Sequence, residues 1–144
     1  MKRHPHLQPL SDDHHAALVL ARRVRRAGSG AGNPAELAEI WEGARASFAR
    51  ELEPHFRVEE KWLFPPLEAA GESALVARAV RDHHQLRELI GSASGPEQVV
   101  AFGDLLHRHV RFEERELFPR AESVLDLATL EAAGRAALAT RKQA

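Results

Sequence analysis

The amino-acid sequence predicts an all-α fold, an antiparallel up-down four-helix bundle with an additional C-terminal helix. In four long segments, apolar residues recur at alternating steps of three and four, which is the spacing of one helix face. Short glycine- or proline-containing stretches separate these segments, as expected for antiparallel neighbours in a bundle. No segment shows the alternating pattern of a strand, and 144 residues suffice for a single domain with one core.

The N-terminal residues 1–9 are expected to form a flexible tail. Pro5 and Pro9 oppose regular structure there, and no apolar period is present. We assign this stretch no function, and place the single helical domain at residues 10–144.

The first helix is expected from about Ser11 to about Ala27. Ser11 or Asp12 offers a side-chain oxygen for an N-cap, and a glycine-rich stretch follows the last helical turn. His14 lies on the apolar face of this helix with two alanines and a valine. His15 points toward the arginine side instead, which favours His14 as the inward histidine.

The second helix opens at Asn33-Pro34, a cap followed by proline at the first helical position. Pro54 removes one backbone hydrogen bond and should bend this helix, and Pro65-Pro66 should end it. Two polar side chains interrupt its apolar face. The expected inward residues are Leu37, Trp41, Ala44, Phe48, Leu52, His55, Glu59 and Trp62, down to Phe64.

Three further helices are expected at residues 73–90, 96–119 and 123–139. The third and fourth helices again carry histidine on an apolar face, and Pro119 should end the fourth. The alanine- and leucine-rich fifth helix should pack across the bundle. The expected inward residues are Val76, Ala79, His83, Leu86 and Ile90 on the third helix, and Val99, Phe102, Leu106, His109, Glu113 and Leu117 on the fourth.

One motif occurs twice with identical offsets. It reads HFRVEEKWLFP at residues 55–65 and HVRFEERELFP at residues 109–119, and an Asp-His-His triplet precedes each copy, at residues 13–15 and 82–84. Residues four apart share a helix face, so each motif presents an imidazole beside a carboxylate. The duplicated unit offers one site six candidate metal ligands: His14, His55, Glu59, His83, His109 and Glu113.

Burying these six side chains unpaired would cost several kcal/mol each. Hydrogen bonds between histidines and glutamates could satisfy a single pair without metal, and that alternative stays open. Inward histidines on all four helices favour metal instead. Four imidazoles and two carboxylates exceed the needs of one tetrahedral zinc ion and suit two octahedral iron or manganese ions, with Glu59 and Glu113 bridging. Calcium and magnesium prefer oxygen ligands.

Composition excludes several other classes of function. The 20 basic and 21 acidic residues are mixed along the chain, which leaves no basic stripe for nucleic acid, and the run at residues 22–26 is interpreted as a solvated helix face. The chain has no cysteine, so thiolate metal sites are excluded. No apolar run could span a bilayer and no signal peptide is evident, so a cytoplasmic location is expected.

The Asp-His-His triplets and the two His-x-x-x-Glu motifs with Leu-Phe-Pro resemble a hemerythrin-like domain of the HHE cation-binding family, from about Leu10 to Pro119. The resemblance implies two non-haem iron ions with oxo or hydroxo bridging, manganese or a mixed pair being alternatives. It implies a small partner: oxygen, nitric oxide, peroxide or iron itself. Carried over residue by residue, it implies the ligand set His14, His55, Glu59, His83, His109 and Glu113.

The chain departs from the oxygen carriers of that family at two places. Arg87 stands where they have a histidine, four residues after the one on the third helix. Their last carboxylate is an aspartate five residues after its histidine, whereas this chain has Glu113 at four and Glu114 at five. We expect more open coordination unless His15 or His84 turns inward, and the departure argues against reversible oxygen carriage.

Residues around the ligands are expected to support them. Four carboxylates adjacent in sequence are candidates to accept the second N–H of an imidazole, although a solvated helix edge is the alternative for the two glutamates. These are Asp13, Asp82, Glu60 and Glu114. Four aromatic residues are expected in the core, where they would exclude water: Trp62, Phe64, Phe112 and Phe118.

Three functions remain open from the sequence. A binding or sensing module that takes up oxygen, nitric oxide, peroxide or iron without turnover is favoured slightly, because no additional acid or base stands out on the inward faces. A di-iron redox enzyme that consumes peroxide or oxygen is the second possibility. A metal-free bundle with a hydrogen-bonded polar core is the third. The native metal, the protein partner and the oligomeric state stay undetermined.

Overall fold

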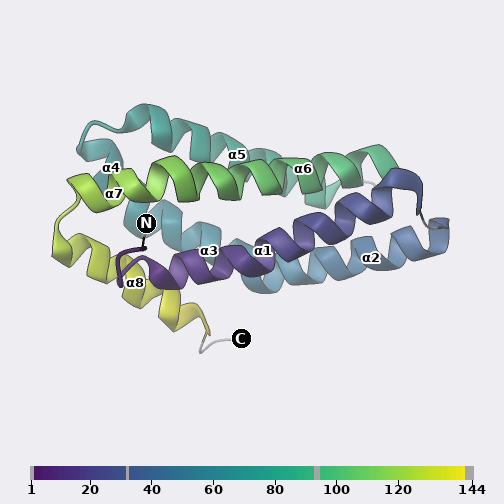
Figure 1. The fold of residues 1–144 in the computed structure, drawn as a ribbon, viewed down its shortest axis with the longest axis horizontal. Helices are drawn as coiled ribbons and strands as arrows, with labels where there is room; N and C mark the ends of the chain where they lie inside the picture. The colour runs from purple at the N-terminus through teal and green to yellow at the C-terminus, as the bar shows by residue number, and fades with distance from the viewer. Residues whose placement is uncertain (1, 32, 93–94, 142–144) are drawn as a thin grey trace.

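The computed structural model describes residues 2–31, 33–92 and 95–141, and these residues form helices and short connections without a strand. Four long helical segments run alternately up and down, and a shorter helix follows them, which confirms the all-α bundle (Figure 1). The α-helices are α1 (Gln8–Arg26), α2 (Pro34–Ser47), α3 (Glu53–Val58), α4 (Phe64–Ala69), α5 (Ser73–Gly91), α6 (Pro96–Phe112), α7 (Phe118–Val124) and α8 (Leu127–Arg141).

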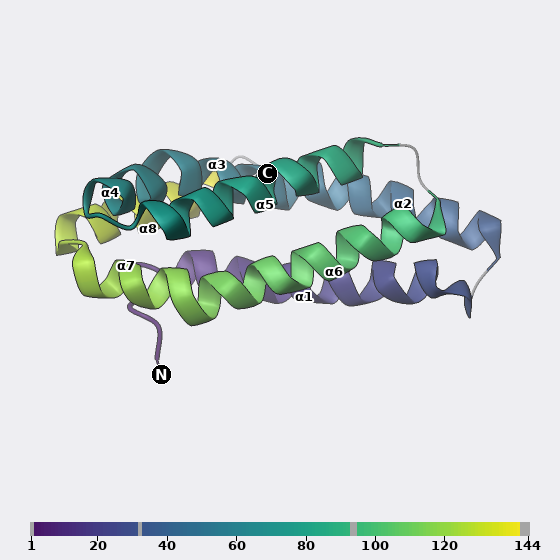
Figure 2. The same cartoon turned by 90° about the horizontal axis from the view of Figure 1, so that it is seen from above.

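The second long segment consists of α2, α3 and α4 in succession, and the fourth consists of α6 and α7. Helix α1 packs along α6, and α5 packs along α6 on another side, so α6 has two antiparallel neighbours (Figures 1 and 2). Helix α8 crosses one end of the bundle, where it contacts α1 and α3. None of the helices in the described ranges is long and apolar enough to cross a membrane.

Prolines lie inside the long segments at three places, Pro54, Pro65-Pro66 and Pro119, and none of them ends a helix. The expected helix ends at Pro65-Pro66 and Pro119 are therefore wrong, because the segments continue to Ala69 and Val124. A π-helical turn precedes each proline: Phe48–Leu52 before Pro54, Glu59–Leu63 before Pro65 and Glu113–Leu117 before Pro119.

These wide turns explain how the helices accommodate proline. The residue before each proline donates its N–H to the carbonyl five residues back, as Phe64 does to Glu59 and Phe118 does to Glu113. Proline lacks the N–H for the usual bond, and in a regular helix its ring would clash with the carbonyl four residues back. The extra residue in the π-helical turn lets the residue before proline donate this wider hydrogen bond, so the N–H that proline lacks is not needed.

The wide turn also changes which side chains face inward. Trp62 was expected in the core, but 40% of it is exposed, whereas Leu63 and Phe64 are buried. The turn that begins at Glu59 places these next two residues on the inward side and directs Trp62 toward α8. The expected core positions of Phe64, Phe112 and Phe118 are confirmed.

The expected flexible tail at residues 1–9 is also wrong for its described part. Helix α1 begins at Gln8, three residues earlier than expected, and Leu7 is fully buried. The Arg3 guanidinium donates to the backbone carbonyl of Glu114, 2.9 Å away, and the backbone N–H of His4 donates to a carboxylate on α7. Long-range contacts fix this segment, and local sequence pattern does not report such contacts.

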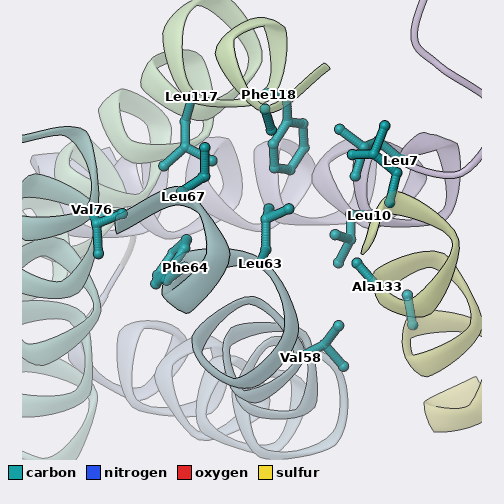
Figure 3. Close-up of a cluster of buried hydrophobic side chains, with 14 of the residues drawn as sticks. Leu7, Leu10, Val58, Leu63, Phe64, Leu67, Val76, Leu117, Phe118 and Ala133 are labelled. Atoms are coloured by element: carbon teal, nitrogen blue, oxygen red, sulfur yellow. The ribbon is translucent and has the colours of Figure 1, made fainter. Parts of the chain in front are cut away.

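The hydrophobic core has two parts with a polar layer between them. The first cluster lies toward α4, α7 and α8 and includes Leu7, Leu63, Leu67 and Phe118 (Figure 3). The second lies toward the opposite end and includes Trp41, Phe48, Phe102 and Leu106. On each long segment the inward histidine falls between residues of the two clusters, so the four histidines lie at one level of the bundle.

Candidate metal centre

The structure brings together all six side chains predicted from the duplicated motif. None is more than 3% exposed, and both glutamates are fully buried. Each long segment contributes one histidine, and the second and fourth segments add a glutamate one helical turn further on. His15 and His84 are exposed, so neither supplies a further inward imidazole.

The six side chains form two overlapping groups. The His14 group consists of His14, His55, Glu59 and Glu113, and the His83 group consists of His83, His109, Glu59 and Glu113. Within each group the potential ligand atoms all lie within 4.8 Å of one another. Among the described residues these are the clusters whose spacing could hold a metal ion, and the two groups share both glutamates.

Each shared glutamate presents one oxygen to each group. The four Nε2-to-oxygen distances are 3.0 Å from His14 to Glu113 Oε1, 3.3 Å from His55 to Glu59 Oε2, 3.1 Å from His83 to Glu59 Oε1 and 3.3 Å from His109 to Glu113 Oε2. The arrangement follows from the two His-x-x-x-Glu motifs, because each places its glutamate between its own histidine and one from a neighbouring segment.

The outer nitrogen of every imidazole has a carboxylate partner. The four Nδ1-to-oxygen distances are 2.7 Å from His14 to Glu114, 3.0 Å from His55 to Asp13, 2.7 Å from His83 to Glu60 and 3.0 Å from His109 to Asp82. These are the four acceptors expected from sequence. Such contacts fix the orientation and the tautomer of an imidazole, leaving the other nitrogen available.

These contacts determine the inward chemistry. An ionised carboxylate can only accept, so each Nδ1 carries the hydrogen, and Nε2 of a neutral imidazole then offers a lone pair. That lone pair faces a carboxylate oxygen, which also has only lone pairs. Most of the inward atoms accordingly lack a hydrogen-bond partner among the described residues: Nε2 of His55, His83 and His109, both oxygens of Glu59, and Oε2 of Glu113.

Two lone-pair atoms can face each other in a dry interior only if a cation lies between them. A second proton on each imidazole is one such cation, and a metal ion is another. Nitrogen and oxygen donors without thiolate suit a transition metal. The residues present therefore fit metal binding, on the evidence of these unpartnered buried atoms.

Without metal, the carboxylates favour protonated imidazoles. Burial alone would lower the pKa of His109, but the charge of Glu113 and the hydrogen bond to Asp82 raise it to about 10. Burial would raise the pKa of Glu113, yet the surrounding imidazoles hold it well below its usual range. Nearby carboxylates outweigh burial in the same way and raise the pKa of the other three imidazoles, His14, His55 and His83.

Aromatic rings cover the imidazoles of two segments. Phe56 stacks on His83 with ring centroids 3.8 Å apart, and Phe118 stacks on His14 with centroids 5.2 Å apart. Both phenylalanines are almost completely buried. Because they are apolar, they exclude water from these faces and leave the Nε2 atoms directed at the shared glutamates. Phe56 was not singled out from the sequence, although it follows His55 directly.

Arg87 lies where the oxygen carriers have a histidine, and it faces outward from the centre. Its guanidinium donates to Glu53 at 2.8 Å and to Glu60 at 2.8 Å. Partial burial would raise the pKa of Glu60, but hydrogen bonds from His83 and Arg87 lower it to about 2. Arg87 thus keeps the partner of His83 ionised. The only sign of this role in the sequence is that an arginine replaces the histidine at this position.

Two further arginines behind the centre were missed. Arg3 donates to the Glu114 carboxylate at 3.2 Å, and Arg141 on α8 donates to Asp13 at 3.1 Å. Each pair joins residues more than 100 positions apart, so no local pattern could reveal it.

Comparison with known proteins gives one match. The family model described as the hemerythrin HHE cation binding domain matches residues 6–121 of the 144. The matched range contains all six buried side chains and their four outer carboxylate partners, and it ends before α8. No curated protein and no solved structure matches the chain.

Proposed function

We propose, starting from the fact that the chain belongs to the hemerythrin HHE cation-binding family, that it holds two non-haem iron ions and uses them to bind or sense a small molecule. One ion would sit in the His14 group and the other in the His83 group. Manganese or a mixed pair could take the same positions, because the donor set is also suitable for manganese.

The observation that carries this proposal is the way the two glutamates are shared. Glu59 and Glu113 each direct one oxygen to either group, so both carboxylates would help to hold a cation in each group. Each position would receive two imidazole nitrogens and two carboxylate oxygens from the chain. An octahedral ion would have further positions open to a small ligand.

Bound iron would supply reversible one-electron chemistry and open coordination positions for oxygen, nitric oxide or peroxide. The chain's own residues prepare the site. Asp13, Asp82, Glu60 and Glu114 hold the imidazoles in the tautomer that can bind metal. Phe56 and Phe118 exclude water from two of the rings.

We propose that a small ligand approaches the His83 group from a surface cleft beside it. This cleft lies between α4 and α5 and has a volume of ≈ 630 Å³. Its wall includes Glu60, the hydrogen-bond partner of His83, together with Phe64 and Val80. A molecule entering there would approach the centre past Glu60.

Metal analysis of freshly purified protein tests the proposal. Protein produced with added iron should contain about two irons per chain and show near-ultraviolet charge-transfer absorption. Less than about half an iron per chain, with helicity and stability retained, would support the metal-free polar core instead.

Matched histidine variants sharpen the test. His55→Ala and His109→Ala should both abolish stable metal loading, because each removes an Nε2 from one group. His107→Ala should load normally, because His107 is not part of either group. Equal loss in all three variants would contradict the assignment. Assays of peroxide and oxygen turnover on loaded protein then separate a sensor from an enzyme.

A further inference from the structure

Two parts of the molecule that lie outside the four long segments meet over one side of the centre. We call residues 2–7 together with α8 (Leu127–Arg141) the clasp. We propose that the clasp controls metal occupancy of the His14 group, and that the His83 group binds metal independently of it. This inference rests on the proposed two-metal function and adds a regulated element to it.

The clasp places an arginine behind each histidine of the His14 group. Arg3 donates to the Glu114 carboxylate, whose other oxygen lies 2.7 Å from Nδ1 of His14. Arg141 donates to Asp13, whose other oxygen lies 3.0 Å from Nδ1 of His55. Each arginine therefore holds in place the carboxylate that orients a candidate ligand.

Arg3 has a second connection to the same histidine. Its guanidinium lies over the ring of Phe118, 5.6 Å from the centroid, and Phe118 stacks on the imidazole of His14. Arg3 also donates to the backbone carbonyl of Glu114. Displacing residues 2–7 would thus remove the cation that pairs with Glu114 and lies over Phe118, the two neighbours of His14.

The His83 group is supported from within the bundle. The guanidinium behind it belongs to Arg87 on α5, which pairs with Glu60 and Glu53 of the neighbouring segment. The Nδ1 of His109 pairs with Asp82, also on α5. None of these contacts involves the clasp, so opening it would leave both imidazoles of the His83 group held in place.

The two halves of the clasp depend on each other. Gly134 of α8 lies directly against the backbone carbonyl of His6, so closely that a methyl group at this position would overlap it. Leu7 and Ala133 are both fully buried in the same cluster (Figure 3). Arg141 also donates to the backbone carbonyl of Pro9. The segment and the helix are therefore expected to dock as one unit.

Metal binding in the His14 group and docking of the clasp are linked thermodynamically. If the docked clasp strengthens metal binding in the His14 group, metal in that group must strengthen docking of the clasp by the same factor. Loss of one ion would then loosen α8 and residues 2–7 while the bundle stays folded.

A double variant tests the proposal. Arg3→Gln combined with Arg141→Gln removes both guanidinium groups and leaves every candidate ligand in place. Anaerobic titration with ferrous iron should give two tight equivalents for the unmodified protein. The double variant should bind one equivalent with unchanged affinity and the second on the order of tenfold more weakly. Tenfold is the smaller end of the loss in affinity that is typical when a hydrogen-bond partner of a metal ligand is mutated. Arg120→Gln removes a guanidinium on α7 that pairs with Glu72, outside the clasp, and should match the unmodified protein.

A second variant opens the clasp without changing any charge. Gly134→Ala adds only a methyl group, which favours the helix itself but collides with His6. It should weaken the same single equivalent. Gly43→Ala makes the same change in α2, where a methyl group would meet nothing within 4 Å, and should bind iron normally.

Hydrogen exchange supplies an independent readout. Amides of α8 should exchange more slowly in the unmodified protein with both equivalents bound than in the metal-free protein. Unchanged binding in both test variants, or equal weakening of both equivalents, would overturn the role of the clasp. Failure of the unmodified protein to bind two equivalents would instead overturn the proposed function, so the two failures are distinguishable.

Discussion

Removing metal should reverse the pH dependence of stability. In the metal-free protein the pKa of His109 is about 10, against 6.5 for an ordinary histidine. A group that binds its proton more tightly when folded stabilises the fold below its unfolded pKa, and that contribution is lost as the pH rises through its folded pKa. Metal-free protein should therefore be most stable near or below pH 6.5 and lose stability toward pH 10.

The size of this loss follows from the same two values. Each pKa unit corresponds to about 1.4 kcal/mol, so His109 alone could contribute several kcal/mol, up to about 5 kcal/mol. That is comparable with the whole stability of a small domain. The three other buried imidazoles have raised pKa values and act in the same direction.

Denaturant unfolding of chelator-treated protein, followed by circular dichroism at a series of pH values, measures this effect. Iron-loaded protein should show the opposite trend through the ordinary histidine range, because metal must displace protons from the imidazoles. His109→Gln should flatten the metal-free curve, and His107→Gln should leave it unchanged. Metal-free stability that is constant or rises between pH 6.5 and pH 10 would refute the reasoning.

Two further variants test other parts of the structure. Asp82→Asn removes the charged partner of His109 Nδ1 and should lower metal affinity roughly 10- to 100-fold in an iron titration, whereas Asp104→Asn, which removes a surface carboxylate paired with Arg25, should not. Leu63→Ala should lower the free energy of unfolding by about 2–5 kcal/mol, and the neighbouring Trp62→Ala by only about 1 kcal/mol or less, as measured with denaturant. The reverse order would mean that the π-helical turn is absent in solution.

Much of the centre could be predicted because it depends on local periodicity. A histidine and a glutamate four residues apart share a helix face in any α-helix, so His55 with Glu59 was readable from sequence. Repetition of the motif identified the same pair in the second half of the chain. The outer carboxylates were also within reach, because Asp13 and Asp82 each directly precede an inward histidine.

The helix ends could not be predicted in the same way. Proline usually stops a helix, and nothing local indicates that a segment will widen by one residue and continue past Pro65. Trp62 was wrongly predicted to face the core because the extra residue of the π-helical turn was not predicted. The repeat of Leu-Phe-Pro after each inward glutamate is the one signal in the sequence that indicates a shared backbone irregularity.

The packing of residues 2–7 was missed for a different reason. Arg3 meets Glu114 across 111 positions of sequence, and Arg141 meets Asp13 across 128. Pairings at this separation depend on how whole helices dock, which hydrophobic periodicity does not specify. Leu7 lies between two prolines, and an isolated leucine there gives no apolar period.

The π-helical turns have a consequence for how this chain can vary. Each one inserts a residue where a regular helix has none, and one residue corresponds to about 100° of rotation about the helix axis. Deleting a single residue from the turn at Glu59–Leu63 should therefore rotate every later side chain of α4 out of phase with the bundle. The half of the molecule beyond the histidines would mispack, although each helix kept its length and composition. A sequence that lost this residue during evolution would need apolar residues at different positions along the rest of the helix to keep its core.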